Sequence, residues 1–134
     1  MAQAREMVVV PPLTEREFKA IQTYLSILRE RFGKRMEKIV LFGSKSRGDS
    51  EPDSDIDILV IMSDEDREQR RMLIGLASQI SLDYDVLLSP RVMSRKKWES
   101  KQGFTMYRNV QHDGLLLSLK EGKLAFEPIT IAQV

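Results

Sequence analysis

The chain has 134 residues, which fits one domain that can bury its own core. It has no cysteine and one histidine, which excludes disulfides and thiolate metal sites and argues against a histidine-rich zinc site. The 21 basic and 20 acidic residues give a net charge of +1, so the overall charge does not predict a strongly basic surface for nucleic acid or membrane.

The N-terminal segment holds one short apolar run, Met7–Val10, followed by two prolines. The run is too short for a signal peptide or a membrane span, so we expect a cytoplasmic protein with no membrane association. The first predicted helix comes next. Thr14 and Glu17 have the spacing of a capping box, apolar residues then recur at intervals of three and four to Phe32, and Gly33 is placed to end the helix.

Two strands are predicted on either side of a polar stretch. The continuous apolar run Ile39–Phe42 indicates a buried strand that ends at Gly43. After the polar stretch, residues 55–62 are rich in β-branched side chains and form the clearest strand pattern in the chain. Leu59 and Ile61 share one face of this strand, so the C-terminal segment or a second subunit must cover them, and we expect a homodimer.

The second half of the chain alternates helices and strands. A helix begins near residues 63–66 and carries apolar residues to Ile80. A strand over Asp83–Leu88 then ends at Ser89-Pro90. Short helices are expected around Trp98, capped by Ser94, and from Phe104 to His112, followed by a hairpin over 115–126; the basic residues between 91 and 101 are interpreted as a solvated helix face. The predicted fold is one α/β (α+β) domain, residues 1–134, with a small mixed sheet, a core over about 14–90 and small C-terminal elements over 91–134.

The Gly43-Ser44 turn is the first candidate for chemistry. Glycine lets the backbone bend sharply and approach a ligand, and exposed amides at such a turn attract phosphate oxygens. The Ser44 hydroxyl adds a donor, and Arg47 adds a fixed charge whose geometry suits phosphate. Alone, the dipeptide is equally compatible with an ordinary turn between a strand and a loop.

The second candidate is the pair Asp55 and Asp57. Side chains alternate across a strand, so both carboxylates point to the same face, where they repel each other unless a cation lies between them. Oxygen-only ligation by aspartates suits Mg²⁺ or Mn²⁺ rather than zinc. The alternative is a solvated strand end.

A third carboxylate is expected at the start of the following predicted strand. If the two strands are neighbours, Asp85 lies within reach of Asp55 and Asp57, as a two-metal site requires. Asp83 shares the Asp85 face and is a rival. We prefer Asp85 because apolar residues follow it directly and anchor it in the core.

The combined pattern resembles the minimal nucleotidyltransferases of the DNA polymerase β superfamily. Gly43-Ser44, ten intervening residues (45–54), Asp55-Ile56-Asp57 and a later aspartate match the pattern of that family. Leu41-Phe42, Arg47-Gly48 and Ser54 match the minimal branch as well, which includes the antitoxins of HEPN/MNT pairs.

The resemblance implies an enzyme with a small mixed sheet, helices packed on one face of that sheet and the active site on the other face. Asp55, Asp57 and Asp85 would hold two Mg²⁺ ions, and Gly43, Ser44 and Arg47 would bind the phosphates of ATP or another nucleoside triphosphate. A nucleoside monophosphate would move to a hydroxyl acceptor with release of pyrophosphate. The partner would be a HEPN-type toxin, and an RNA acceptor stays open.

Three other interpretations compete with this one. The chain could be a nucleotide-binding antitoxin subunit that masks a partner with slow or no catalysis. It could be a metal-dependent nuclease or phosphatase, which also uses paired aspartates but does not need the Gly-Ser turn. It could also be a structural domain without chemistry.

Overall fold

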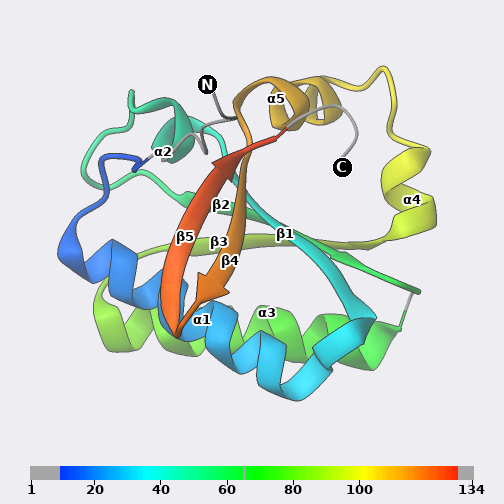
Figure 1. Cartoon of the computed structure of the whole chain (residues 1–134), viewed down its shortest axis with the longest axis horizontal. Helices are drawn as coiled ribbons and strands as arrows, with labels where there is room; N and C mark the ends of the chain where they lie inside the picture. Colours follow the sequence, from blue (N-terminus) through cyan, green and yellow to red (C-terminus); the bar gives the residue numbers. More distant parts are fainter. Residues whose placement is uncertain (1–9, 65, 130–134) are drawn as a thin grey trace, which may run out of the picture.

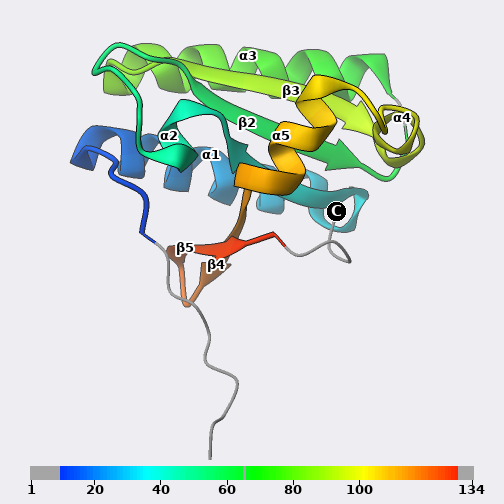
Figure 2. The same cartoon turned by 90° about the horizontal axis from the view of Figure 1, so that it is seen from above.

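The computed structural model describes residues 10–64 and 66–129 and shows a five-stranded mixed sheet with helices on both faces (Figures 1 and 2). The strand order is β3-β2-β1-β4-β5, so the expected α+β architecture with a small mixed sheet is confirmed. The helices were expected on one face, but α4 and α5 cover apolar residues on the other face as well. The strands are β1 (Met36–Phe42), β2 (Ile56–Met62), β3 (Leu88–Ser94), β4 (Leu115–Lys120) and β5 (Lys123–Pro128). The helices are α1 (Glu15–Phe32), η1 (Gly33–Arg35), α2 (Ser44–Arg47), α3 (Arg67–Tyr84), α4 (Arg95–Glu99) and α5 (Thr105–Asp113).

The first helix forms as its sequence predicts. The Thr14 hydroxyl accepts a hydrogen bond from the Glu17 amide at 3.1 Å, and Glu17 Oε1 accepts one from the Thr14 amide at 2.8 Å, which completes the capping box. Gly33, with φ of 53°, ends the helix. These caps fix where α1 begins and ends, and the N-terminal one also orients Glu17 toward the loop after β1.

Strand pairing brings the candidate residues to one end of the sheet. β1 and β2 are antiparallel with Phe42 opposite Asp57, while β3 runs parallel to β2 with Ser89 opposite Asp57. Because β1 ends where β2 begins, the turn after Phe42 and the aspartates before and at the start of β2 meet at the same edge.

The two faces of the sheet have separate apolar cores. The helices α1 and α3 pack on one face, below the sheet in Figure 1. On the other face, Trp98 of α4 and Val110 of α5 cover Leu59 and Ile61. The C-terminal helices therefore supply the expected cover, and this face no longer gives a reason to expect a homodimer.

The segment between α3 and β3 differs from the sequence prediction. The prediction of a strand over Asp83–Leu88 is wrong. The helix α3 continues to Tyr84, and Asp85 ends it with a left-handed backbone conformation at φ 56° and ψ 52°. The strand instead begins at Leu88 and continues through Pro90 to Ser94. β3 lies at the edge of the sheet, where the missing amide of a proline is tolerated.

The C-terminal elements follow their sequence signals. Ser94 caps α4, Gly114 follows α5, and β4 and β5 form a hairpin through Glu121 and Gly122. Both turn residues have positive φ, 54° and 78°, as a tight turn that matches the twist of a hairpin requires. No helix in the described part of the chain is long and apolar enough to cross a membrane.

Candidate active site

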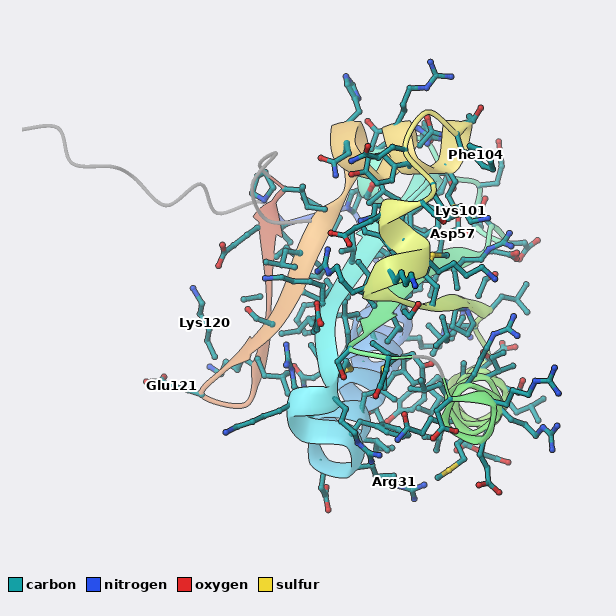
Figure 3. The ribbon with its side chains drawn as sticks, turned by 90° about the vertical axis from the view of Figure 1, so that its right-hand side faces the viewer. Arg31, Asp57, Lys101, Phe104, Lys120 and Glu121 are labelled. Atoms are coloured by element: carbon teal, nitrogen blue, oxygen red, sulfur yellow. The ribbon has the colours of Figure 1, made fainter. Side chains whose placement is uncertain are left out.

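Gly43 and Asp57 meet at the end of the sheet. Gly43 has φ of 80°, a backbone conformation that disfavours other residues, and a methyl group on its Cα would overlap Asp57 Oδ2. The glycine is therefore required for the close approach of the Asp57 carboxylate to the turn, and not only for the bend. This contact joins the two halves of the sequence motif in space, near the upper end of the sheet where Figure 3 labels Asp57.

Asp55 and Asp57 form a charged pair. Asp55 precedes β2 and is exposed, whereas Asp57 is the second residue of β2 and is half-buried. Burial raises the pKa of Asp57, and the neighbouring Asp55 carboxylate raises it further, while the charges of Arg91 and Arg47 act in the opposite direction. The site thus holds negative charge that the folded chain only partly compensates.

The turn after Gly43 is anchored to α5. Ser44 is the first residue of α2 and is half-buried. The Ser46 hydroxyl lies 2.8 Å from the Asp113 carbonyl oxygen and 3.2 Å from that of Gly43. The Arg47 guanidinium pairs with Asp49 at 3.1 Å and with Asp113 at 3.7 Å. Arg47 therefore lies beside the site, held by two carboxylates that a phosphate group could replace.

A buried ion pair, overlooked in the sequence, supports the same turn. Lys45 Nζ lies 2.5 Å from Glu17 Oε2, and the two side chains are only 3% and 7% exposed. Lys45 also donates to the Glu51 carbonyl oxygen at 3.4 Å. The pair ties α2 to the capped end of α1, so it positions Gly43 and Ser44. The only sequence signal for this pair is the position of Glu17 in the capping box, which predicts that its carboxylate is hydrogen-bonded to the backbone at the start of α1.

The structure does not bring Asp85 to the other two aspartates. Asp85 Oδ2 accepts a hydrogen bond from Arg16 Nη1 of α1 at 2.9 Å, with both side chains largely exposed. Asp83, its rival, lies on the exposed surface of α3, where it accepts a hydrogen bond from Gln79 at 3.0 Å. The described residues contain no group of three or more carboxylate, histidine or cysteine side chains arranged to hold a metal ion.

Two residues of β3 stand near Asp57 instead. Ser89 is directly opposite Asp57, and Arg91 follows on the same face, where its charge acts on the Asp57 carboxylate. Arg91 was assigned to a solvated helix face from the sequence, and that was wrong, because it belongs to a strand. Only the parallel register of β2 and β3, which the local sequence does not encode, could have identified it.

The comparison with protein families agrees with this geometry. The model of the family "Nucleotidyltransferase domain" matches residues 21–110, about two-thirds of the chain, and the match spans the Gly-Ser turn and the paired aspartates. The chain belongs to the nucleotidyltransferase family. It is an enzyme of that class. The structure brings Gly43, Asp55 and Asp57 together and leaves Asp85 apart from them.

Two archaeal relatives of this nucleotidyltransferase come from Methanocaldococcus jannaschii. The first, provisionally named protein adenylyltransferase MJ0604, is 36% identical over 101 residues, which cover 75% of this chain and 97% of the relative. The second, named in the same way as MJ0141, is 34% identical over 62 residues, which cover 46% of this chain and 63% of the relative.

Solved structures support the nucleotidyltransferase fold. A chain from a crystal structure of a mutant of the toxin–antitoxin MntA-HpeT superimposes with a TM-score of 0.51 at 25% identity, covering 73% of this chain and 71% of that one. A chain from a crystal structure of the toxin–antitoxin with AMP-PNP gives a TM-score of 0.50 at 24% identity, covering 71% and 70% of the two chains, and shows the fold alone.

Proposed function

We propose that this nucleotidyltransferase moves the adenylyl group of ATP to a hydroxyl group of an acceptor and releases pyrophosphate. The observation that carries the proposal is the contact between the Asp57 carboxylate and Gly43, which joins a metal-binding side chain to a phosphate-binding turn. ATP is preferred over other nucleoside triphosphates because a relative that matches almost over its full length is named an adenylyltransferase. A cytoplasmic location, where ATP and Mg²⁺ are present, is part of this proposal.

The residues at the site fit one Mg²⁺ ion bound together with a nucleotide. Asp55 and Asp57 repel each other, and burial disfavours the charged form of Asp57, so a divalent cation would relieve both effects. Mg²⁺ often takes only one or two protein carboxylates and completes its coordination with water and substrate phosphates. Bound there, Mg²⁺ would supply charge for the phosphate oxygens and polarise the α-phosphate.

The residues of the chain would perform the rest of the chemistry by positioning and charge. The Gly43 turn, with the Ser44 hydroxyl, would hold the triphosphate, and Arg47 would exchange Asp49 and Asp113 for phosphate oxygens. The acceptor oxygen would form a bond to the α-phosphorus while the bond to pyrophosphate breaks. The proton of the acceptor hydroxyl would pass to solvent or to a nearby carboxylate.

A second Mg²⁺ ion requires a third carboxylate, and we propose Asp85 for this role after a local rearrangement. The Asp85 carboxylate forms an exposed ion pair with Arg16, and such pairs contribute little, roughly 0–1 kcal/mol. The left-handed residue at the end of α3 is also costly for a non-glycine residue. Extension of residues 85–87 in the register of β2 and β3 would place Asp85 opposite Asp53, on the face of Asp55 and Asp57, so this role also requires the segment to move along β2.

The partner is proposed to be a HEPN-type toxin. Support comes from the likeness to a chain of the MntA-HpeT toxin–antitoxin structure. The alternative, a nucleotide-binding antitoxin subunit that masks its partner without turnover, is favoured by the position of Asp85 away from the other carboxylates.

Two labels of ATP separate these functions. The chain is incubated with Mg²⁺, a co-purified partner protein, and ATP labelled at either the α- or the γ-phosphate. Transfer predicts that the α-label becomes covalently attached to an acceptor while the γ-label leaves as pyrophosphate. Asp57→Asn should abolish both signals, and Asp83→Ala on α3 should preserve them. Stable binding of ATP with neither signal establishes the masking subunit, and release of orthophosphate would indicate a phosphatase.

A further inference from the structure

A hollow lies beside the candidate active site, between α3, β3, α4 and the segment that leads to α5. It has a volume of about 290 Å³. Its cations are Arg70 of α3, Arg91 of β3, Lys97 of α4 and Lys101. We call this surface the basic hollow.

Among residues 10–64 and 66–129, no carboxylate forms an ion pair with the four cations of the basic hollow, since none lies within 4.0 Å of their charged nitrogens. What distinguishes the hollow is that four such cations line one small surface that no carboxylate lines. The near-zero net charge of the chain therefore conceals a local concentration of positive charge that suits a polyanion.

An aromatic ring stands at the edge of the same hollow. Phe104 is 58% exposed, which is unusual for a large apolar side chain, and Lys101 Nζ lies 5.2 Å from its ring centroid. Figure 3 looks onto this side of the molecule, with Lys101 at the end of α4 and Phe104 just before α5. A ring for stacking next to cations for phosphate is the combination with which proteins hold unpaired bases.

The basic hollow lies next to the candidate active site on the same face of the sheet. Arg91 lines the hollow and follows two residues after Ser89, which is opposite Asp57, so its side chain is on the Asp57 face of the sheet. A strand bound at Arg91 would therefore lie next to the paired aspartates.

We propose that the basic hollow binds single-stranded nucleic acid through Arg70, Arg91, Lys97 and Lys101, with a base stacked on Phe104. The bound strand would present a terminal hydroxyl to Asp55 and Asp57; this last step rests on the proposed function. An acidic protein segment would match the charge equally well, but its carboxylates leave the exposed ring of Phe104 without a partner.

The binding test measures the fluorescence anisotropy of a labelled, unstructured oligoribonucleotide or oligodeoxyribonucleotide, without ATP and at several salt concentrations. The triple variant Arg91→Gln/Lys97→Gln/Lys101→Gln should weaken binding and lower the slope of log affinity against log salt by about 2. The matched control Lys19→Gln/Lys34→Gln/Lys123→Gln removes the same charge from α1, η1 and β5 and should bind better than the first triple variant. Phe104→Ala should weaken binding by roughly 5- to 150-fold.

Three results overturn this proposal. The first is that the wild-type chain does not bind the oligonucleotide, and the second is that both triple variants lose the same amount of affinity. The third is that poly-glutamate displaces the oligonucleotide while Phe104→Ala binds it as tightly as the wild type, which would identify an acidic protein segment as the ligand. A difference in affinity between the oligoribonucleotide and the oligodeoxyribonucleotide shows which sugar the basic hollow prefers. Asp57→Asn should still bind the strand. Binding without nucleotide transfer to the strand's terminal hydroxyl in the wild type would refute that last step, and absence of transfer to any acceptor would refute the proposed function; both leave the binding role of the basic hollow intact.

Discussion

At the scale of single residues, Gly43 is the position where one added methyl group should do most damage. The methyl would overlap Asp57 Oδ2, and φ of 80° is strained for alanine, so Gly43→Ala should lose nucleotide transfer and roughly 1–3 kcal/mol of unfolding free energy. Gly122→Ala is the matched control, since Gly122 has φ of 78° with no atom near a Cβ. It should lose some stability in urea unfolding but keep its activity per folded molecule.

Asp85 and Arg16 give a second test at this scale. If Asp85 joins the active site, Asp85→Ala abolishes transfer and leaves much nucleotide binding intact, whereas Arg16→Ala releases the carboxylate and keeps or raises the transfer rate. Pyrophosphate release and calorimetric nucleotide binding measure the two effects. Equal, small effects of both substitutions would show that the pair has only a structural role.

At the scale of elements, the buried pair of Lys45 and Glu17 links α2 to α1. Lys45→Met leaves Glu17 buried without its partner, which should cost roughly 3–5 kcal/mol and slow transfer because the Gly43 turn loses its support. Glu17→Gln/Lys45→Met keeps the capping box and removes the stranded charge, so much of the stability should return. Urea unfolding measures both, and Lys19→Met, which breaks the exposed pair with Glu15, should change stability by less than about 1 kcal/mol.

The same pair should make stability depend on pH. Burial acts to raise the pKa of Glu17, but the hydrogen bond and charge of Lys45, with bonds from Thr14, lower it below the ordinary value of 4.5. A lowered pKa stabilises the fold above the ordinary value, and this contribution is lost as the pH falls below 4.5. Between pH 7 and about pH 3.5, the wild type should therefore lose more unfolding free energy than Glu17→Gln/Lys45→Met. Equal losses of unfolding free energy in the wild type and the double variant would contradict this pH dependence.

Elements with a local signal were predicted well from the sequence. The capping box of α1, the apolar runs of β1 and β2, and the turn between β4 and β5 each depend on a few adjacent residues. The end of α3 was not predicted, because residues 83–86 alternate as a strand does and lead into an apolar run. In the structure the helix extends to Tyr84, and Asp85 adopts the left-handed conformation that ends it.

At the scale of the whole molecule, the candidate site depends on pairing between distant segments. The meeting of Gly43 and Asp57 followed from the family resemblance, but Arg91 and the basic hollow depend on the parallel register of β2 and β3. The buried Lys45–Glu17 pair joins two helices that lie on either side of β1 in the chain and has no pattern in the local sequence. Side chains at such long separations are brought together only by the complete fold.

Diffraction from crystals grown with Mn²⁺ and a non-hydrolysable ATP analogue would test the site most directly, since Mn²⁺ replaces Mg²⁺ and scatters anomalously. The expected result is an anomalous peak at about 2.1 Å from carboxylate oxygens of Asp55 and Asp57, with the triphosphate against Gly43 and Ser44. A peak away from both aspartates, or a nucleotide bound without contact to the Gly43 turn, would contradict the proposed active site.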